Sequence, residues 1–558
     1  MLTTMSFKSK AQPTTGWQWA AIGQGSDFDR AIGVVEGKRK EVLVCGTFTN
    51  LLTLGSITIG SPVQNSFICR YDSVGRVLSA QVLASNGQSM ATSIGVDSAG
   101  NTYVAGRFIG TISIGANTFV GSAMLYADGY LAKYDSLGNL LWAQHLRGNP
   151  SSSRSNVIVS DLAVDRQGNV TLVGSFEFQL TIGSTALTSS GSGFSTTFVA
   201  QFDPQGSIRW TLKDGGGATS SASGVKLDSA GNVYVVGQFV NGARFGSQSV
   251  SINSSNSALY VLRVDANGNT MWVRRSGLPN GGRNVRGAAL ALDQATNIYV
   301  TGSFAETATF DTITINSAAA NAEEVYIAKY TSGGTLRWVR QMGSPGNDAG
   351  RKIEVDRTGR CQVLGVSRGA LTIGTLLVPA NDSASLFVAR YDSTGAFESV
   401  LTDAGPHPIQ AMDLTVNALG EGAVVGYYTN GAQLGSTVLP YGGGVDDLFV
   451  ARFGQGGLTA LPEAKANPIT GDLTVYPNPS NSGSIYIILP PAVVHSAHIH
   501  QVQLTDLSGR VVNANAHAYK MKSGQELIVP IADLRTGVYV LRLLSANGTW
   551  TKRITVIN

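Results

Sequence analysis

The chain has 558 residues, of which 67 are glycine and only 14 % are charged, and its formal net charge at pH 7 is +4. This composition excludes a disordered chain and offers no basic footprint for nucleic acid, whereas it is typical of strands and turns. No run of about eighteen apolar residues occurs, so no transmembrane segment is expected, and three cysteines are too few for a disulfide scaffold of this length.

The N-terminal segment carries two expectations. Residues 1–11 lack the apolar stretch of a signal peptide, but the letters KSKAQ after Phe7 resemble the end of a cleaved one, so we expect a remnant of a signal segment here. The following GWQWA, with Trp17 and Trp19, predicts a strand ahead of the first repeat.

One pattern then recurs along the chain. The stretch VDSAGNTYVAGRF, Val96 to Phe108, returns as VDRQGNVTLVGSF, LDSAGNVYVVGQF and LDQATNIYVTGSF. A second stretch, YLAKYDSLGNLLWA from Tyr130, returns as FVAQFDPQGSIRWT, YVLRVDANGNTMWV and YIAKYTSGGTLRWV. Alternating apolar residues around D-x-x-G-N predict two hairpins per copy. The glycine of G-x-F marks the copies at Gly46, Gly106, Gly174, Gly237, Gly302, Gly365 and Gly426.

Two hairpins give each copy four strands, A to D in chain order, and seven copies of about sixty residues predict the blades of a β-propeller. The last copy ends with Phe449 to Phe453 and has no fourth strand, so the strand with Trp17 and Trp19 is expected to complete it and to remove an open sheet edge. For residues 12–457 we therefore predict an all-β, seven-bladed β-propeller closed by the N-terminal strand.

The repeat is similar to a known class. G-x-F, a spacer and then F-V-A-K-Y-D-x-x-G resemble the bacterial β-propeller repeat often named SBBP, over most of the first 457 residues. The resemblance implies the propeller fold and specifies no function, because propellers host binding and catalysis alike.

The sequence changes character after the repeats. Residues 458–471, which carry Pro and Ala, predict a linker. Residues 472–558 contain six or seven short alternating segments with turn elements such as D-L-S-G-R and R-T-G-V-Y, which predict a small Ig-like β-sandwich.

Four short elements of this C-terminal segment form a signature. Its residues are Tyr476, Pro477, Asn478, Pro479, Asp506, Gly509, Arg510, Gly537, Tyr539, Lys552 and Arg553. In this order they resemble the type A sorting domain of the type IX secretion system of Bacteroidetes. The resemblance implies Sec export, passage through the outer membrane with the type IX machinery as partner, and a secreted or cell-surface destination. It also implies that the domain is usually removed.

Candidate binding residues lie in the D–A and B–C connections, which vary most and emerge on one side of a propeller. The most distinctive connection, WVRRSGLPNGGRNVRGAA, holds Arg274, Arg275, Arg283 and Arg286. Guanidinium groups suit bidentate contact with carboxylate, sulfate or phosphate, so an acidic glycan is one candidate partner. Solubility charge and local ion pairs are the alternative interpretation.

Patterns for catalysis, cofactors and metals are weak. Only His145 and His407 lie among the repeats, with no Ser elbow, paired-carboxylate motif or metal-ligand spacing around them, so no catalytic residue, cofactor or metal ligand is predicted. The oxygens of D-x-x-G-N are explained by hairpin turns and are too few for calcium. Carboxylates from distant blades that converge at the central channel stay an open alternative.

The sequence leads to one main functional hypothesis: non-catalytic binding of a glycan or another cell-surface partner by an exported protein. A carbohydrate-active lyase or hydrolase is the first alternative, which clustered acidic or His residues at the channel would favour. An interaction scaffold for a protein partner is the second, which an exposed apolar patch would favour.

Overall fold

The computed structural model describes residues 15–557 except 123–124, 151–154, 192, 278–282, 320–321, 375, 379–383, 404–406, 456–473, 482, 489–498, 507–510, 514–519, 524–525, 533 and 546–547. The chain divides into two compact units, residues 1–458 and 459–558. All regular elements in the described ranges are β-strands, and every sheet is antiparallel. The expected signal remnant and linker lie outside the described residues.

Strands of the first unit pair in sets of four that follow the hairpin repeats. The sets are β2 (Arg30–Glu36), β3 (Val42–Leu54), β4 (Ile57–Tyr71) and β5 (Val77–Ser85); β6 (Gln88–Val96), β7 (Thr102–Ile109), β10 (Asp128–Tyr134) and β11 (Leu140–Arg147); β12 (Val157–Val164), β13 (Val170–Phe176), β16 (Thr196–Phe202) and β17 (Ile208–Lys213); β18 (Ser220–Leu227), β19 (Val233–Val240), β22 (Ser257–Val264) and β23 (Thr270–Gly277); β24 (Val285–Leu292), β25 (Ile298–Ala305), β28 (Glu323–Tyr330) and β29 (Leu336–Gly343); β30 (Ala349–Val355), β31 (Cys361–Ser367), β34 (Ser385–Tyr391) and β35 (Phe397–Thr402); and β36 (Ile409–Val416), β37 (Gly422–Tyr428), β40 (Asp447–Gln455) and β1 (Thr15–Gly25). Within each set, A to D below denote the strands in this order.

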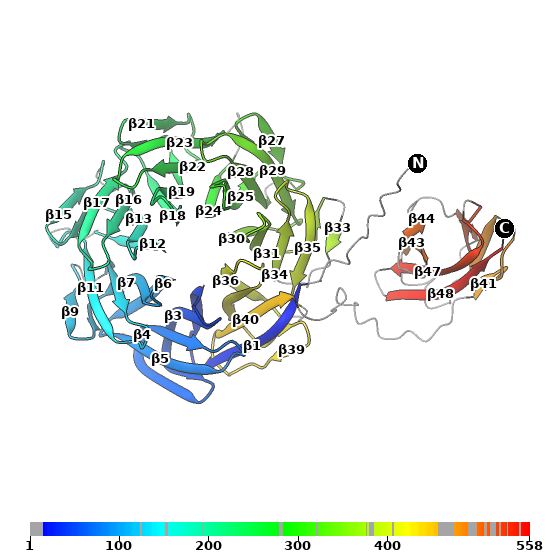
Figure 1. Ribbon diagram of the computed structural model, residues 1–558, viewed down its shortest axis with the longest axis horizontal. Helices are drawn as coiled ribbons and strands as arrows, with labels where there is room; N and C mark the ends of the chain where they lie inside the picture. Colours follow the sequence, from blue (N-terminus) through cyan, green and yellow to red (C-terminus); the bar gives the residue numbers. More distant parts are fainter. Residues whose placement is uncertain are drawn as a thin grey trace, which may run out of the picture. The chain divides into compact units, whose positions relative to one another are not determined.

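The A strands lie nearest the centre of this unit, and the later strands of each set lie farther out (Figure 1). Each A strand contacts the A strand of the next set, and β36 contacts β2, so the series of contacts returns to its start. Buried apolar clusters fill the space between consecutive sets, for example Val236, Leu259 and Phe304 between the sets that begin with β18 and β24.

The N-terminal strand β1 supplies the D strand of the last set. It pairs antiparallel with β40, from Thr15 opposite Gln455 to Gly23 opposite Leu448. Its Trp19 Nε1 donates to Ser73 O at 3.0 Å, and Trp142 of β11 makes the equivalent bond to Pro204 O of the next set. The two ends of the unit are therefore joined by a ladder and by the same tryptophan contact that joins neighbouring sets.

Glycine is required in the G-x-F motif for a steric reason. In every set the A strand carries a register shift opposite this glycine, as between Ala31 and Gly33 opposite Gly46. A Cβ on Gly46 would stand 2.0 Å from Arg30 O, and one on Gly302 would stand 1.9 Å from Arg286 O. A β-bulge that brings a carbonyl this close to the neighbouring strand tolerates no side chain.

The B–C connections, expected as variable loops, are regular. Most contain a short hairpin: β8 (Thr111–Ile114) with β9 (Asn117–Val120), β14 (Gln179–Ile182) with β15 (Thr185–Thr188), β20 (Gly242–Phe245) with β21 (Gln248–Ser251), β26 (Thr307–Phe310) with β27 (Ile313–Asn316), β32 (Leu371–Ile373) with β33 (Leu376–Val378), and β38 (Ala432–Leu434) with β39 (Thr437–Leu439). Ile112 and Ile114 of β8 are buried, and Ser85 of β5 pairs with Ile112. The first strand of four of these hairpins (β8, β14, β26 and β32) thus pairs with the end of the D strand of the preceding set.

The second unit contains two four-stranded antiparallel sheets. One runs β41 (Thr474–Tyr476), β42 (Ser484–Ile488), β46 (Glu526–Pro530) and β45 (Lys520–Ser523). The other runs β44 (Val511–Asn513), β43 (Ile499–Asp506), β47 (Gly537–Ser545) and β48 (Gly548–Val556). Ile485, Leu541 and Ile554 are buried, because alternate residues of each sheet face an apolar interior.

Candidate functional site

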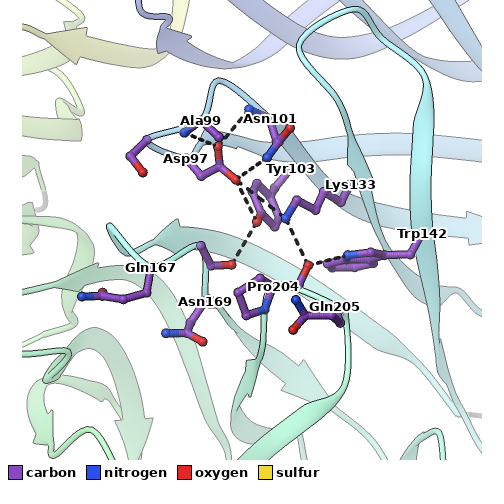
Figure 2. A network of polar contacts seen from close by, with 12 residues as sticks. Asp97, Ala99, Asn101, Tyr103, Lys133, Trp142, Gln167, Asn169, Pro204 and Gln205 are labelled. Carbon is purple, nitrogen blue, oxygen red and sulfur yellow. Dashed lines mark hydrogen bonds and ion pairs between the residues drawn. The ribbon is translucent and has the colours of Figure 1, made fainter.

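The D-x-x-G-N turns are structural joints between neighbouring sets. Asp97 Oδ1 accepts the amides of Ala99 and Asn101, and its Oδ2 accepts Asn101 Nδ2 at 2.7 Å and the Tyr103 hydroxyl at 3.3 Å. Figure 2 shows Lys133 beside this carboxylate and donating to Pro204 O of the next set at 3.1 Å. The turn oxygens are therefore supplied with donors by the protein itself, as hairpin chemistry predicts.

Charged side chains from A strands meet at the centre of the first unit. Lys352 Nζ of β30 lies 3.2 Å from Asp413 Oδ1 of β36 and 3.9 Å from Asp161 Oδ1 of β12. Lys226 of β18 pairs with Glu354 of β30 at 2.6 Å. We name these five residues the central charge cluster. Because β12 and β18 are not neighbours of β30, these ion pairs cross the centre.

The register explains how the cluster forms. Asp161, Lys352 and Asp413 each occupy the position directly after the A-strand bulge, where Gly33 and Gly224 stand in other sets. Burial alone would lower the pKa of Lys352, but Asp161, Asp413 and Glu354 outweigh it, so the pKa is raised and the ammonium stays charged.

Each of the three carboxylates in the central charge cluster already accepts hydrogen bonds or pairs with a lysine. Asp161 also accepts the Ser93 hydroxyl at 2.8 Å and the Val225 amide, and Asp413 accepts the Val34 amide at 2.8 Å. A general acid or base needs a carboxylate that is free to exchange a proton with substrate. The arrangement therefore fits a structural tie across the centre better than a catalytic pair.

Arg274, Arg275, Arg283 and Arg286, the arginines singled out by the sequence, have separate surroundings. Arg274 lies over the Trp272 ring at 5.3 Å and donates to Gly334 O, while Arg275 donates to Ser276 O.

The other two form ion pairs. Arg283 pairs with Glu306 at 2.7 Å, and Arg286 pairs with Glu323 at 2.8 Å. The charges of these two arginines are thus compensated locally.

An aromatic and arginine group, which we name the loop-face cluster, surrounds the D–A connection after β1. The Arg30 guanidinium lies 4.6 Å from the Tyr427 ring centroid and 5.1 Å from that of Phe28, and it pairs with Asp446 at 2.5 Å. Phe28 is 40 % exposed. We include Tyr441 as the fifth member because it is 49 % exposed and lies five residues before Asp446, in the connection between β39 and β40. No local sequence pattern predicts this group, because Phe28 and Arg30 are about 400 residues away from Tyr427, Tyr441 and Asp446 along the chain.

His145 is partly buried and lies in a group of hydrogen bonds and ring contacts around Asp128. Its Nε2 lies 2.7 Å from Asp128 Oδ2, and its ring stacks on Phe119 at 5.1 Å. Asp128 also accepts the amide of Gly148 and both donors of Ser122. His407 has no described contact of this kind.

The second unit brings together distant parts of its motif. Asn478 Nδ2 donates to Arg553 O at 3.1 Å, and Asn478 Oδ1 accepts the Thr555 amide at 2.8 Å. The Tyr476 ring stacks on Tyr486 at 5.4 Å, and the Tyr539 hydroxyl donates to Arg535 O.

The remaining motif residues lie in or next to the strands of the second unit, or outside the described residues. Pro477 and Pro479 flank Asn478, Gly537 begins β47, and Lys552 lies in β48. Asp506 ends β43, and Gly509 and Arg510 lie outside the described residues.

Two further properties apply to the described ranges. No group of three or more His, Cys, Asp or Glu side chains in them is arranged to hold a metal ion. They also contain no helix long and apolar enough to cross a membrane.

Comparisons with known proteins identify the C-terminal segment. Residues 474–557 match the family model of the secretion system C-terminal sorting domain. The chain is also 32 % identical over 114 residues to the regulatory protein FlaEY of Caulobacter vibrioides and 26 % identical over 115 residues to an uncharacterized WD repeat-containing protein, L264, of Acanthamoeba polyphaga mimivirus. Each match covers 20 % of this chain, and the chain spans only 11 % and 8 % of these relatives.

Similar solved structures include a protein of unknown function from Dyadobacter fermentans, with 9 % identity, a TM-score of 0.37 and coverage of 80 % of this chain and all of that one. A puromycin hydrolase is 11 % identical with a TM-score of 0.33, over 72 % of this chain and 59 % of its own. The sorting-domain match supports secretion or a cell-surface location and an interaction with the secretion machinery.

Proposed function

We propose that this chain, whose C-terminal segment is a secretion system sorting domain, is a type IX secretion substrate of Bacteroidetes. We propose further that residues 12–457 form a non-catalytic, seven-bladed β-propeller that binds a partner at the cell surface or outside the cell. The sorting-domain match over residues 474–557 is the observation that carries the destination. The sequence resemblance to SBBP repeats and the closed series of A-strand contacts support the propeller.

The loop-face cluster is the proposed binding surface. Phe28 and Tyr441 expose large ring areas, while Asp446 neutralises the Arg30 that lies between Phe28 and Tyr427. Tyr and Arg are enriched where binding energy concentrates, and an aromatic face with a polar edge suits a sugar ring as well as a protein loop. We name a glycan as the first partner class to test.

An acidic glycan at Arg283 and Arg286 is the second candidate. Glu306 and Glu323 already pair with these arginines at 2.7 and 2.8 Å, so an anionic ligand has to displace them. This competition lowers the expected affinity relative to free guanidinium groups.

A glycan array with the full chain tests the proposal. We expect a set of bound glycans whose signal falls at least tenfold in a Phe28→Ala and Tyr441→Ala double variant and persists in an Arg283→Ala and Arg286→Ala double variant. The reverse pattern favours the arginine site, and an empty array with retained fold refutes glycan binding. Deletion of residues 472–558 in the native host is expected to abolish surface delivery, and unchanged delivery refutes the sorting role.

A further inference from the structure

Two carboxylates face each other where the last set of strands meets the first. Asp29 lies in the D–A connection before β2, and Asp447 begins β40. Both side chains are 0 % exposed, and no well-formed hydrogen bond reaches either oxygen of Asp29 or Asp447 Oδ1, although the Thr49 amide lies near Asp29 and the Gly25 amide near Asp447. Three buried carboxylate oxygens thus lack a well-formed hydrogen bond, which a folded protein avoids unless something else binds them.

The repeats provide internal comparisons for this position. Asp447 stands two residues before the C-strand residue that pairs with the G-x-F glycine, a place that Asn65, Thr196 and Glu324 occupy in other sets. Asp29 stands two residues before the equivalent A-strand residue, where Ser89, Ser220 and Asp348 stand elsewhere.

In those sets the protein supplies the donors. Ser89 Oγ donates to Asn65 Oδ1 at 3.1 Å. Asp348 accepts the Ser344 hydroxyl at 2.7 Å and the Arg368 amide at 2.9 Å. Among the described residues at these equivalent positions, only the pair Asp29 and Asp447 has several oxygens without a well-formed hydrogen bond.

Backbone oxygens and two glycines shape the same place. A Cβ on Gly25 would stand 2.1 Å from Asp29 Oδ2 and 2.3 Å from Leu51 O, and a Cβ on Gly442 would stand 2.6 Å from Asp447 Oδ1. Asp29 Oδ2 and the Leu51 carbonyl oxygen therefore both lie close to the position that a Cβ of residue 25 would occupy. A side chain at residue 25 or 442 would clash with these oxygens, so glycine is needed at both positions.

The electrostatics of the neighbourhood are strongly negative. Burial, then Asp447, raise the pKa of Asp29 to about 8; the Thr49 amide opposes this rise, and Asp27 and Asp446 add to it. Arg30 is the nearby cation, and Asp446 already holds it at 2.5 Å. A single shared proton bridges at most two of the three free oxygens and leaves the third unpaired.

We propose that Asp29 and Asp447, with the Leu51 carbonyl, bind a calcium ion at this junction. Calcium takes six to eight hard oxygen ligands and tolerates irregular geometry, so two carboxylates, backbone carbonyls and water suit it. Ser26, Gly442 and Gly443 are exposed beside the pair, so the ion enters from the surface that carries the loop-face cluster. The ion ties β40 to the D–A connection of the first set.

Calcium binding to the full chain tests this site. The chain is depleted with a chelator, and calcium alone is added in equilibrium dialysis and in calorimetric titration at pH 7.5. We expect one ion per chain at millimolar calcium or below, and a rise in melting temperature of about 3 °C at a hundred times the dissociation constant. An Asp29→Asn variant and an Asp447→Asn variant are expected to lose this ion and the shift.

Asp348→Asn is the matched control, because it changes the equivalent carboxylate that already has donors. This variant is expected to bind calcium as the wild type does. No binding by the wild type at about 10 mM calcium, or equal binding by both Asp29→Asn and Asp447→Asn, refutes the site. If the wild type does not bind calcium and the Asp29→Asn variant has a higher melting temperature than the wild type at pH 8, the calcium site is refuted in favour of a proton shared by Asp29 and Asp447.

Discussion

Replacement of Lys352 by Met is the most informative change to the first unit. The ammonium lies between Asp413 at 3.2 Å and Asp161 at 3.9 Å, and the three side chains are 17 %, 13 % and 11 % exposed. Lys352→Met removes the shared cation and leaves two nearly buried carboxylates facing each other. Breaking a buried ion pair by removing one partner costs about 3 to 5 kcal/mol, and residual solvent contact places this case near 3 kcal/mol.

The melting temperature converts this cost into a measurable shift. Unfolding entropy near 60 °C is about 2.1 cal/mol/K per residue, so about 440 cooperative residues give about 0.9 kcal/mol/K and a fall of about 3 °C. Differential scanning calorimetry of the full chain measures it. Lys226→Met is the matched comparison: its pair with Glu354 is 29 % and 17 % exposed, and we expect about 1 °C or less.

A double variant separates the pair from its surroundings. Lys352→Met with Asp413→Leu removes both charges, so it is expected to recover about half of the loss, with a coupling energy of about 1 to 2 kcal/mol. A Lys352→Met variant that melts within half a degree of the wild type, or above it, refutes the reasoning. That result would mean that desolvation cancels the attraction and that the cluster does not stabilise the centre.

Three further changes test other parts of the fold. Asp403 is 6 % exposed, no well-formed hydrogen bond reaches its carboxylate oxygens, and burial raises its pKa to about 7. Between about pH 4 and pH 7 the folded state therefore holds a proton that the unfolded state has released. The free energy of unfolding consequently falls by about 1.4 kcal/mol per pH unit across this range. Asp403→Asn is expected to flatten this slope in melts at pH 5 and pH 8, and an unchanged slope contradicts the assignment. Trp19→Ala removes the tie from β1 to the first set and should cost roughly 2 to 3 kcal/mol in urea unfolding, whereas no loss would mean that β1 is dispensable. Gly302→Ala places a Cβ 1.9 Å from Arg286 O and should lower the melting temperature by several degrees, while Gly333→Ala, whose Cβ meets only Thr331 Oγ1 at 3.8 Å, should leave it unchanged; equal effects would contradict the bulge argument.

The all-β class is predictable from the amino-acid sequence alone, because the hairpins are local. D-x-x-G-N turns and alternating strands fix each hairpin within about fourteen residues, and the structure has strands at these places. The secretion sorting segment was also readable, since its elements occur in fixed order and the family model matches residues 474–557. The B–C hairpins were missed as strands, although their short alternation around a turn, as in TISIGANTF, was present in the sequence.

Which charged side chains come into contact depends on the three-dimensional packing of the strand sets. Asp161, Lys352 and Asp413 are separated by at least sixty residues and come together only because the bulge gives each A strand the same register toward the centre. Asp29 and Asp447 meet for a related reason: β1 pairs with β40 and carries the start of the chain to its last repeat. Pair contacts of this kind depend on how the sets of strands are closed, which no local pattern records, whereas turn residues and strand alternation act within a few residues and remain legible in the sequence.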